Sequence, residues 1–136
     1  MKKVIKSTVA ILLCLTFSVC LISCNDVDAT GLWEDATYLK ETTLGEGKTE
    51  FYLSIEAGEQ KLKLTIKTDK EMLGDALYEL ELTNDPSFFD TLNGIELNWD
   101  ETHMYWAFYI GEEYATLGVN QTVIENGATY RFVCSK

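Results

Sequence analysis

The sequence predicts an α+β domain in which a single helix packs on a mixed or antiparallel sheet. Residues 51–66 hold two segments that alternate apolar and polar side chains, which is the pattern of half-buried strands. Residues 69–80 change to the spacing of an amphipathic helix. Residues 88–134 return to short strand-like segments separated by turns. Strands interrupted by one helix are typical of the α+β class.

The first 24 residues have the features of a secretory signal. Three lysines among the first six residues precede an apolar run of 14 residues, Val9 to Ile22, which is shorter than the roughly 20 residues of a membrane-spanning helix. The run ends in Leu-Ile-Ser-Cys, which resembles the lipobox of bacterial lipoproteins. We therefore expect residues 1–24 to be a lipoprotein signal, Cys24 to be acylated and residues 25–31 to be a tether. An ordinary signal peptide and a short anchor helix are the alternatives.

The chain after Cys24 is strongly acidic. All 22 Asp and Glu residues follow Cys24 but only eight of the 11 Lys and Arg residues do, so the formal charge of this part is −14. Nucleic acid and anionic headgroups are poor partners for it, because phosphate binding needs a basic face. Attachment to a membrane is expected through the lipid on Cys24. This places the domain outside the cytoplasm, on the bacterial surface or the periplasmic face.

Residues 51–66 predict a hairpin whose tip is Ala57-Gly58-Glu59. The lysines of its second strand face water, where Glu50 and Glu56 can oppose them. Upstream, residues 32–39 predict an edge strand or an extended arm with Trp33 as its buried plug. The inward-facing positions of the hairpin are Phe51, Leu53, Ile55, Leu62, Leu64 and Ile66.

One helix is predicted in residues 69–80. Asp69 is its expected N-cap, because an Asp side chain accepts hydrogen bonds from the free N–H groups of a first turn. Gly74 weakens a helix by up to about 1 kcal/mol relative to Ala, and we expect it to let the helix lie close to the sheet. The apolar residues at helical spacing are Met72, Leu73, Ala76, Leu77 and Leu80.

Strands are also predicted in residues 88–99, 113–119 and 128–134, and the most aromatic one lies in "HMYWAFYIGEEYA", residues 103–115. Tyr105 and Tyr109 fall on one face of it, exposed or facing a ligand. Gly111-Glu112 predicts a type II′ turn after this strand. The other face carries the predicted core residues Trp106, Phe108 and Ile110.

The sequence after Cys24 contains no recognisable catalytic pattern. It has one histidine, His103, and three serines, none in a nucleophile elbow, whereas a triad needs a base and an orienting partner. His103 and Cys134, 31 residues apart, do not suggest a zinc site. We expect no enzymatic activity, no metal site and no required cofactor. Cys14 and Cys20 leave with the signal, so Cys134 is expected to be a buried thiol without a disulfide partner.

Four motifs of the downstream half occur in a recognisable order. They are "LGDAL" at a helix start, an "NGI" turn, a "YWAFYI-x-x-EYA-x-x-GV" hairpin and a closing "I-x-x-GATY-x-FV" strand. In this order they resemble the transcobalamin-like C-terminal domain of small bacterial lipoproteins, and "LWEDATY" and "TTLGEG" extend the resemblance to residues 32–136. It implies a β-rich, ubiquitin-like domain that is related to the β-grasp fold and carries one helix.

The resemblance also implies a ligand. In vertebrate cobalamin carriers this domain is the smaller half of a clamp over a corrinoid, and here the helical half is absent. A partner would have to supply it. His103 is either a cobalt ligand or an exposed turn residue. The ligand-side residues that the resemblance implies are Phe88, Phe89, Trp99, His103, Met104, Tyr105, Trp106 and Tyr109.

The sequence thus predicts a lipid-anchored, extracytoplasmic, non-catalytic binding protein. Its ligand would be a corrinoid or a similarly flat amphipathic molecule, because aromatic side chains can cover an apolar macrocycle. The alternative is an interaction module that docks on a protein or a surface polymer through the same aromatic edge.

Overall fold

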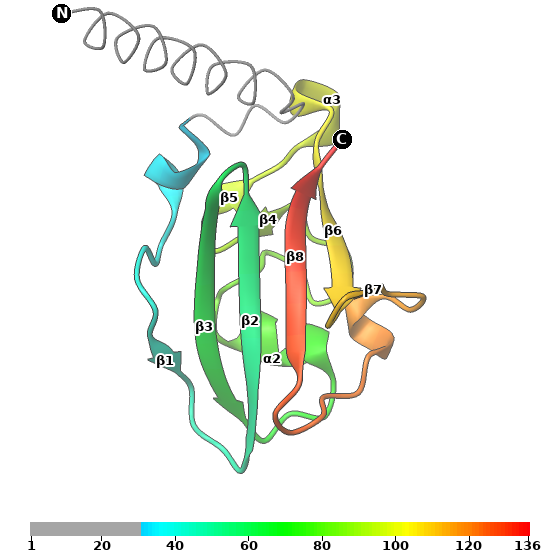
Figure 1. Ribbon diagram of the computed structural model, residues 1–136. Coiled ribbons are helices and arrows are strands. Elements are labelled where there is room, and N and C mark those ends of the chain that lie inside the picture. The colour runs from blue at the N-terminus through cyan, green and yellow to red at the C-terminus, as the bar shows by residue number, and fades with distance from the viewer. Residues whose placement is uncertain (1–30) are drawn as a thin grey trace, which may run out of the picture.

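Residues 31–136 are described by a computed structural model (Figure 1). The predicted signal, the lipidation site Cys24 and nearly all of the tether lie outside these residues. None of the described helices is long and apolar enough to cross a membrane. The elements are η1 (Leu32–Asp35), β1 (Thr43–Leu44), β2 (Thr49–Ala57), β3 (Gln60–Thr68), α2 (Leu73–Glu79), β4 (Thr91–Leu92), β5 (Ile95–Glu96), α3 (Trp99–Thr102), β6 (Tyr105–Ile110), β7 (Glu113–Tyr114), η2 (Val119–Gln121) and β8 (Thr129–Ser135).

The main sheet has the order β1-β3-β2-β8-β6-β7 and is mixed. The last strand, β8, lies in its centre, parallel to β2 and antiparallel to β6. Helix α2 lies behind the sheet (Figure 1) and turns its buried residues toward the core. The predicted α+β class with one helix on a mixed sheet is confirmed. A central last strand parallel to the first strand of the hairpin is also the arrangement of a β-grasp sheet.

The predicted hairpin is confirmed in register and in burial. Phe51 opposes Ile66 and Leu53 opposes Leu64, and all four side chains are fully buried. The strands meet at the predicted tip, between Ala57 and Gln60. Alternation puts one face of β2 and β3 into the core and leaves the other face open to solvent. Within residues 31–136, one continuous core cluster extends from Trp33 to Cys134.

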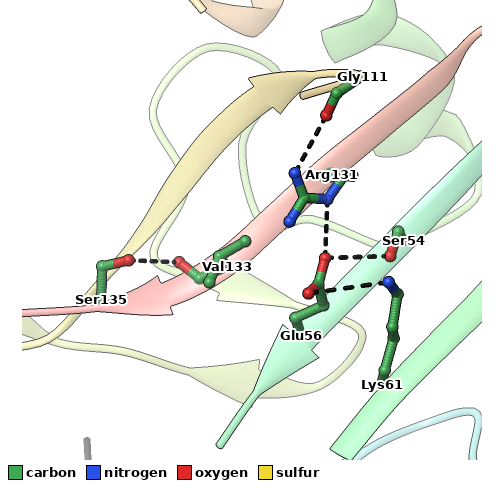
Figure 2. Close-up of polar contacts among 7 residues, drawn as sticks. All are labelled: Ser54, Glu56, Lys61, Gly111, Arg131, Val133 and Ser135. Carbon is green, nitrogen blue, oxygen red and sulfur yellow. Dashed lines mark hydrogen bonds and ion pairs between the residues drawn. The ribbon is translucent and has the colours of Figure 1, made fainter. Parts of the chain in front are cut away.

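An ion-pair network crosses the open face of the sheet (Figure 2). Arg131 Nε donates to Glu56 Oε2 at 2.9 Å, and Arg131 Nη1 donates to the Gly111 carbonyl at 3.1 Å. Lys61 Nζ lies 3.9 Å from the same Glu56 carboxylate. The network joins β2 and β8 to the turn between β6 and β7, and so holds that turn against the centre of the sheet.

The start of helix α2 differs from the prediction. Met72, not Asp69, is the N-cap, and no side chain caps the first turn. The Asp69 carboxylate instead accepts a hydrogen bond from the Lys48 backbone N–H at 2.9 Å, which ties the ends of the hairpin together. Gly74 is needed for a close approach, but to the Pro86 carbonyl and not to the sheet. A Cβ at Gly74 would overlap that oxygen.

Two predicted strands are also replaced. Residues 32–39 do not form an edge strand; they begin with η1, which buries Trp33 as the expected plug. Residues 88–98 contain only the short pair β4 and β5, apart from the main sheet, and Trp99 begins α3. In the turn between β4 and β5, the buried Asn93 side chain accepts from the Tyr38 N–H and donates to the Tyr38 C=O. These two hydrogen bonds attach the pair to the chain that follows η1.

We expect Gly74→Ala to lower the free energy of unfolding by about 1–3 kcal/mol, because the added methyl overpacks a backbone contact. Alanine is the better helix former by up to about 1 kcal/mol, so the two effects oppose each other. Chemical denaturation of a soluble form of residues 31–136 measures the change. Asp75→Ala, at the exposed neighbouring position, should change stability by no more than about 0.5 kcal/mol. A stabilised Gly74→Ala variant would contradict the close approach.

Candidate functional site

A cleft of about 380 Å³ opens at the edge of the sheet formed by β6 and β7. We call it the aromatic cleft. Its volume is at the lower end of the range of roughly 300–1,000 Å³ for ligand pockets. None of its lining residues is charged. They are Ser87, Phe88, Phe89, Tyr105, Trp106, Phe108, Tyr114, Ala115, Thr116, Leu117, Gly118, Val119 and Phe132.

The floor of the aromatic cleft is continuous with the core. Phe108 of β6 stacks on the buried Phe132 of β8, with ring centroids 4.9 Å apart and an interplanar angle of 9°. Phe89 meets Phe132 edge-on at 5.4 Å. Because Phe132 sits on the central strand, these rings are held by the sheet as well as by each other. The floor is therefore preorganised for a flat apolar surface.

The rim is aromatic and exposed. Phe88 is 90% exposed, Tyr114 59% and Tyr105 39%, which is unusual for large apolar side chains that sit together. The backbone of Phe88 is held in a turn by the Asp85 side chain. Asp85 Oδ1 accepts from the Ser87 N–H at 2.7 Å and from the Phe88 N–H at 3.0 Å. These hydrogen bonds lower the pKa of Asp85, so its carboxylate stays charged.

Three tyrosines gather where β6 meets β7. Tyr109 and Tyr114 oppose each other across the two strands with ring centroids 5.2 Å apart. Partial burial raises the pKa of Tyr105, and the nearby phenols of Tyr114 and Tyr109 raise it further. The predicted turn between the strands forms with a positive φ of 61° at Gly111 but not at Glu112. This agrees with a type II′ turn, which needs glycine only at its first central position.

Trp106 carries a buried donor without a protein partner. Among the described residues only its Nε1 and the Thr83 hydroxyl are buried side-chain polar atoms that make no hydrogen bond. Trp33 offers a contrast, since its Nε1 donates to the Ala57 carbonyl at 3.1 Å. A buried unsatisfied N–H costs about 1–3 kcal/mol, so Trp106 is held in the cleft wall by its ring alone.

The structure brings half of the sequence-predicted site residues together: Phe88, Phe89, Tyr105 and Trp106 line the aromatic cleft. Trp99 and His103 lie beside it on and after α3, with ring centroids 5.5 Å apart, and Trp99 reaches Tyr105 at 6.3 Å. Tyr109 lies on the open sheet face, where the Arg131 guanidinium is 5.2 Å from its ring centroid.

Two predictions on the aromatic strand are wrong. Met104 is a core residue, 7% exposed, with its Sδ 3.6 Å from the Cys134 Sγ. It points inward because His103 adopts a left-handed conformation that ends α3 and turns the chain. Ile110 is 41% exposed and not in the core, since it ends β6 beyond the reach of the core. Trp106 and Phe108 are half-buried and face both the core and the cleft.

Sequence reasoning missed Tyr114 and Leu117. Tyr114 had a signal, because the type II′ turn fixes its register opposite Tyr109. Leu117 had none. The predicted strand in residues 113–119 stops at Tyr114, and the chain then crosses to η2 and brings Leu117, 55% exposed, to the rim.

His103, Cys134 and the carboxylates do not gather into a metal centre within the described residues. Within residues 31–136, no three His, Cys, Asp or Glu side chains lie close enough to hold a metal ion. His103 is exposed at the end of α3. Cys134 is buried, as expected, and burial raises the pKa of its thiol. The groups that converge on the aromatic cleft are mainly aromatic rings.

No family model and no curated protein matches this chain. Among solved structures it is similar to a proposed metal-binding protein from Ruminococcus gnavus ATCC 29149, with a TM-score of 0.60 and 17% identity over 65% of this chain and 98% of the other. At this identity the likeness shows the fold alone. Haptocorrin in complex with Cbi aligns with a TM-score of 0.46 and 15% identity, over 68% of this chain but only 26% of haptocorrin, too distant to support a functional argument.

The unpaired indole predicts unequal effects of two matched substitutions. Trp33→Phe and Trp106→Phe remove similar volumes, but only Trp33→Phe breaks a hydrogen bond. We expect Trp33→Phe to cost about 1–2 kcal/mol more than Trp106→Phe in the free energy of unfolding. Urea denaturation of both variants gives the comparison. Equal losses would mean that the Trp106 N–H does find a partner in solution.

Proposed function

We propose that the described domain is a non-catalytic binding domain whose aromatic cleft covers one face of a flat amphipathic ligand, with a corrinoid as the leading candidate. The observation that carries the proposal is the exposed rim of Phe88, Tyr105 and Tyr114 above a rigid aromatic floor. Exposed rings on a preorganised base lose little conformational freedom when a ligand covers them. The sequence resemblance to the transcobalamin-like domain gives the same class of ligand.

The cleft is small and open, which bears on affinity. About 380 Å³ at a sheet edge encloses only part of a corrin ring, so the opposite face of the ligand stays in water. We therefore propose modest affinity for the isolated domain and a partner protein that covers the remaining face. Ligand pockets that bind tightly enclose most of the ligand surface, which one domain of this shape does not do.

We further propose that the domain is held at an extracytoplasmic membrane face by a lipid on Cys24 and presents its ligand to a transporter. The support is the signal-like segment of residues 1–24 and its lipobox-like end. Mass spectrometry of the full chain from a bacterial host tests the anchor, because acylation of Cys24 after removal of residues 1–23 changes the mass in a defined way.

A protein- or polymer-interaction module is the second candidate. Phe88 and Leu117 favour it, because apolar side chains 90% and 55% exposed are also what protein hot spots look like. The same cleft would then take side chains of a partner.

Calorimetric titration of residues 31–136 with cyanocobalamin tests the leading candidate. We expect saturable binding, with a Kd in the micromolar to millimolar range for a half-covered ligand. Tyr105→Ser and Tyr114→Ser should each weaken binding about five- to tenfold, because each removes one aromatic contact. Both rings are more than one-third exposed, so the melting temperature should change little.

Tyr78→Ser is the matched control, because Tyr78 is 50% exposed on α2 and does not line the cleft. It should leave binding unchanged. No saturable heat at millimolar cyanocobalamin would rule out the corrinoid. If Tyr105→Ser and Tyr114→Ser instead abolish binding to a purified surface partner, the interaction module is the better description.

A further inference from the structure

Most segments that form the aromatic cleft come from a stretch of the sequence that contains acidic residues but no Lys or Arg. Between Glu71 and Tyr130 there are twelve Asp and Glu residues and no Lys or Arg. Lys70 is the last cation before this stretch and Arg131 the first after it. Every residue that lines the cleft except Phe132 belongs to the stretch. The cleft is therefore built almost wholly from a part of the sequence that has no Lys or Arg.

Three cations of the sheet, Lys61, Lys63 and Arg131, lie together on its open face. Lys61 and Lys63 project from β3, and Lys63 Nζ lies 4.5 Å from the ring centroid of Tyr52. Arg131, the first cation in sequence after the cleft segments, bonds to Glu56 and to the Gly111 carbonyl (Figure 2). Its charge is thus already paired with a carboxylate and is not directed at the cleft.

Carboxylates, by contrast, adjoin the cleft rim. Asp85 is hydrogen-bonded to the backbone of Ser87 and Phe88, both lining residues. Glu113 directly precedes the rim residue Tyr114, and both are exposed. Glu112 instead lines a separate hollow on the open face, together with Lys61, Lys63 and Arg131. The lining of the aromatic cleft is uncharged, and the carboxylates of Asp85 and Glu113 belong to the segments that form its rim.

We propose that the aromatic cleft selects a ligand that carries positive charge, namely an organic cation with a flat or bulky apolar body. This rests on the proposed function of the cleft as a binding site and adds the sign of the ligand's charge. The faces of Trp, Tyr and Phe rings attract cations, and the acidic rim lowers the energy of a cation in the cleft. An anion of equal size meets the same apolar contacts but an opposing field.

Two organic ions of nearly the same size and shape test the sign directly. Tetraphenylphosphonium and tetraphenylborate both present four phenyl rings and differ in charge. Titrated into residues 31–136 at about 20 mM salt, where screening is weak, the phosphonium should bind about tenfold more tightly than the borate. The preference should shrink as salt is added.

A double variant locates the source of the preference. Asp85→Asn and Glu113→Gln together remove the two rim charges, and asparagine keeps an oxygen that can accept from Ser87 and Phe88. We expect the preference to fall to about threefold or less. The control combines Glu41→Gln and Glu46→Gln, which make the same charge change at exposed positions. Glu41 and Glu46 flank β1, the strand at the opposite edge of the sheet from β7.

The outcomes separate the two proposals. Equal or tighter binding of the borate overturns the charge selection and leaves the cleft as a binding site. An equal loss of preference in the control variant also overturns it, because overall charge would then be the cause. If neither ion binds, or if Tyr105→Ser and Tyr114→Ser leave both affinities unchanged, the cleft is not a ligand site and the proposed function fails as well.

Discussion

The parallel pairing of β8 with β2 is the contact on which the rest of this domain depends. Tyr52 is paired with Thr129, 77 positions further along the chain. This pairing closes the sheet around the hairpin and gives β6 a strand to bind. It also places Phe132 beneath Phe108 and Phe89, and Arg131 beside Glu56. Phe132 in the cleft floor and Arg131 in the open-face network are thus successive residues of β8, whose side chains point to opposite faces of the sheet.

The two sides of the domain consequently differ in what holds them. The side that faces α2 is held together by apolar packing. The side that is open to solvent is held together by an ion pair and by cation–π contacts. The aromatic cleft lies at the edge between them, where the sheet ends and α2 does not reach. Aromatic side chains can be exposed at this edge without exposing the core, because Phe132 of β8 is packed beneath them. A binding surface at that edge can change without weakening the fold, since its rim residues contribute little buried area.

Local patterns were sufficient for the elements that are defined locally. Alternation correctly placed the six predicted inward residues of the β2–β3 hairpin, and Gly111 marked the turn after β6, because both depend on near neighbours. Asp69 failed as a cap because the hairpin end competes for its carboxylate through Lys48. Met104 was misassigned because the left-handed residue before it resets the direction of the strand. The position of Leu117 depends on a crossing to η2 that no local pattern encodes. What the sequence could not supply was the set of long-range contacts that decides which aromatic residues share the cleft.

The burial of Cys134 has a chemical consequence of its own. It is the one cysteine among the described residues, and it packs against Met104 inside the core. A lone surface thiol would couple two copies of the chain through a disulfide wherever the surroundings are oxidising. Here the raised pKa suppresses the thiolate and the fold blocks an approaching oxidant. Copies crowded on one surface would then stay unlinked, and oxidation of this residue would report that the domain has opened.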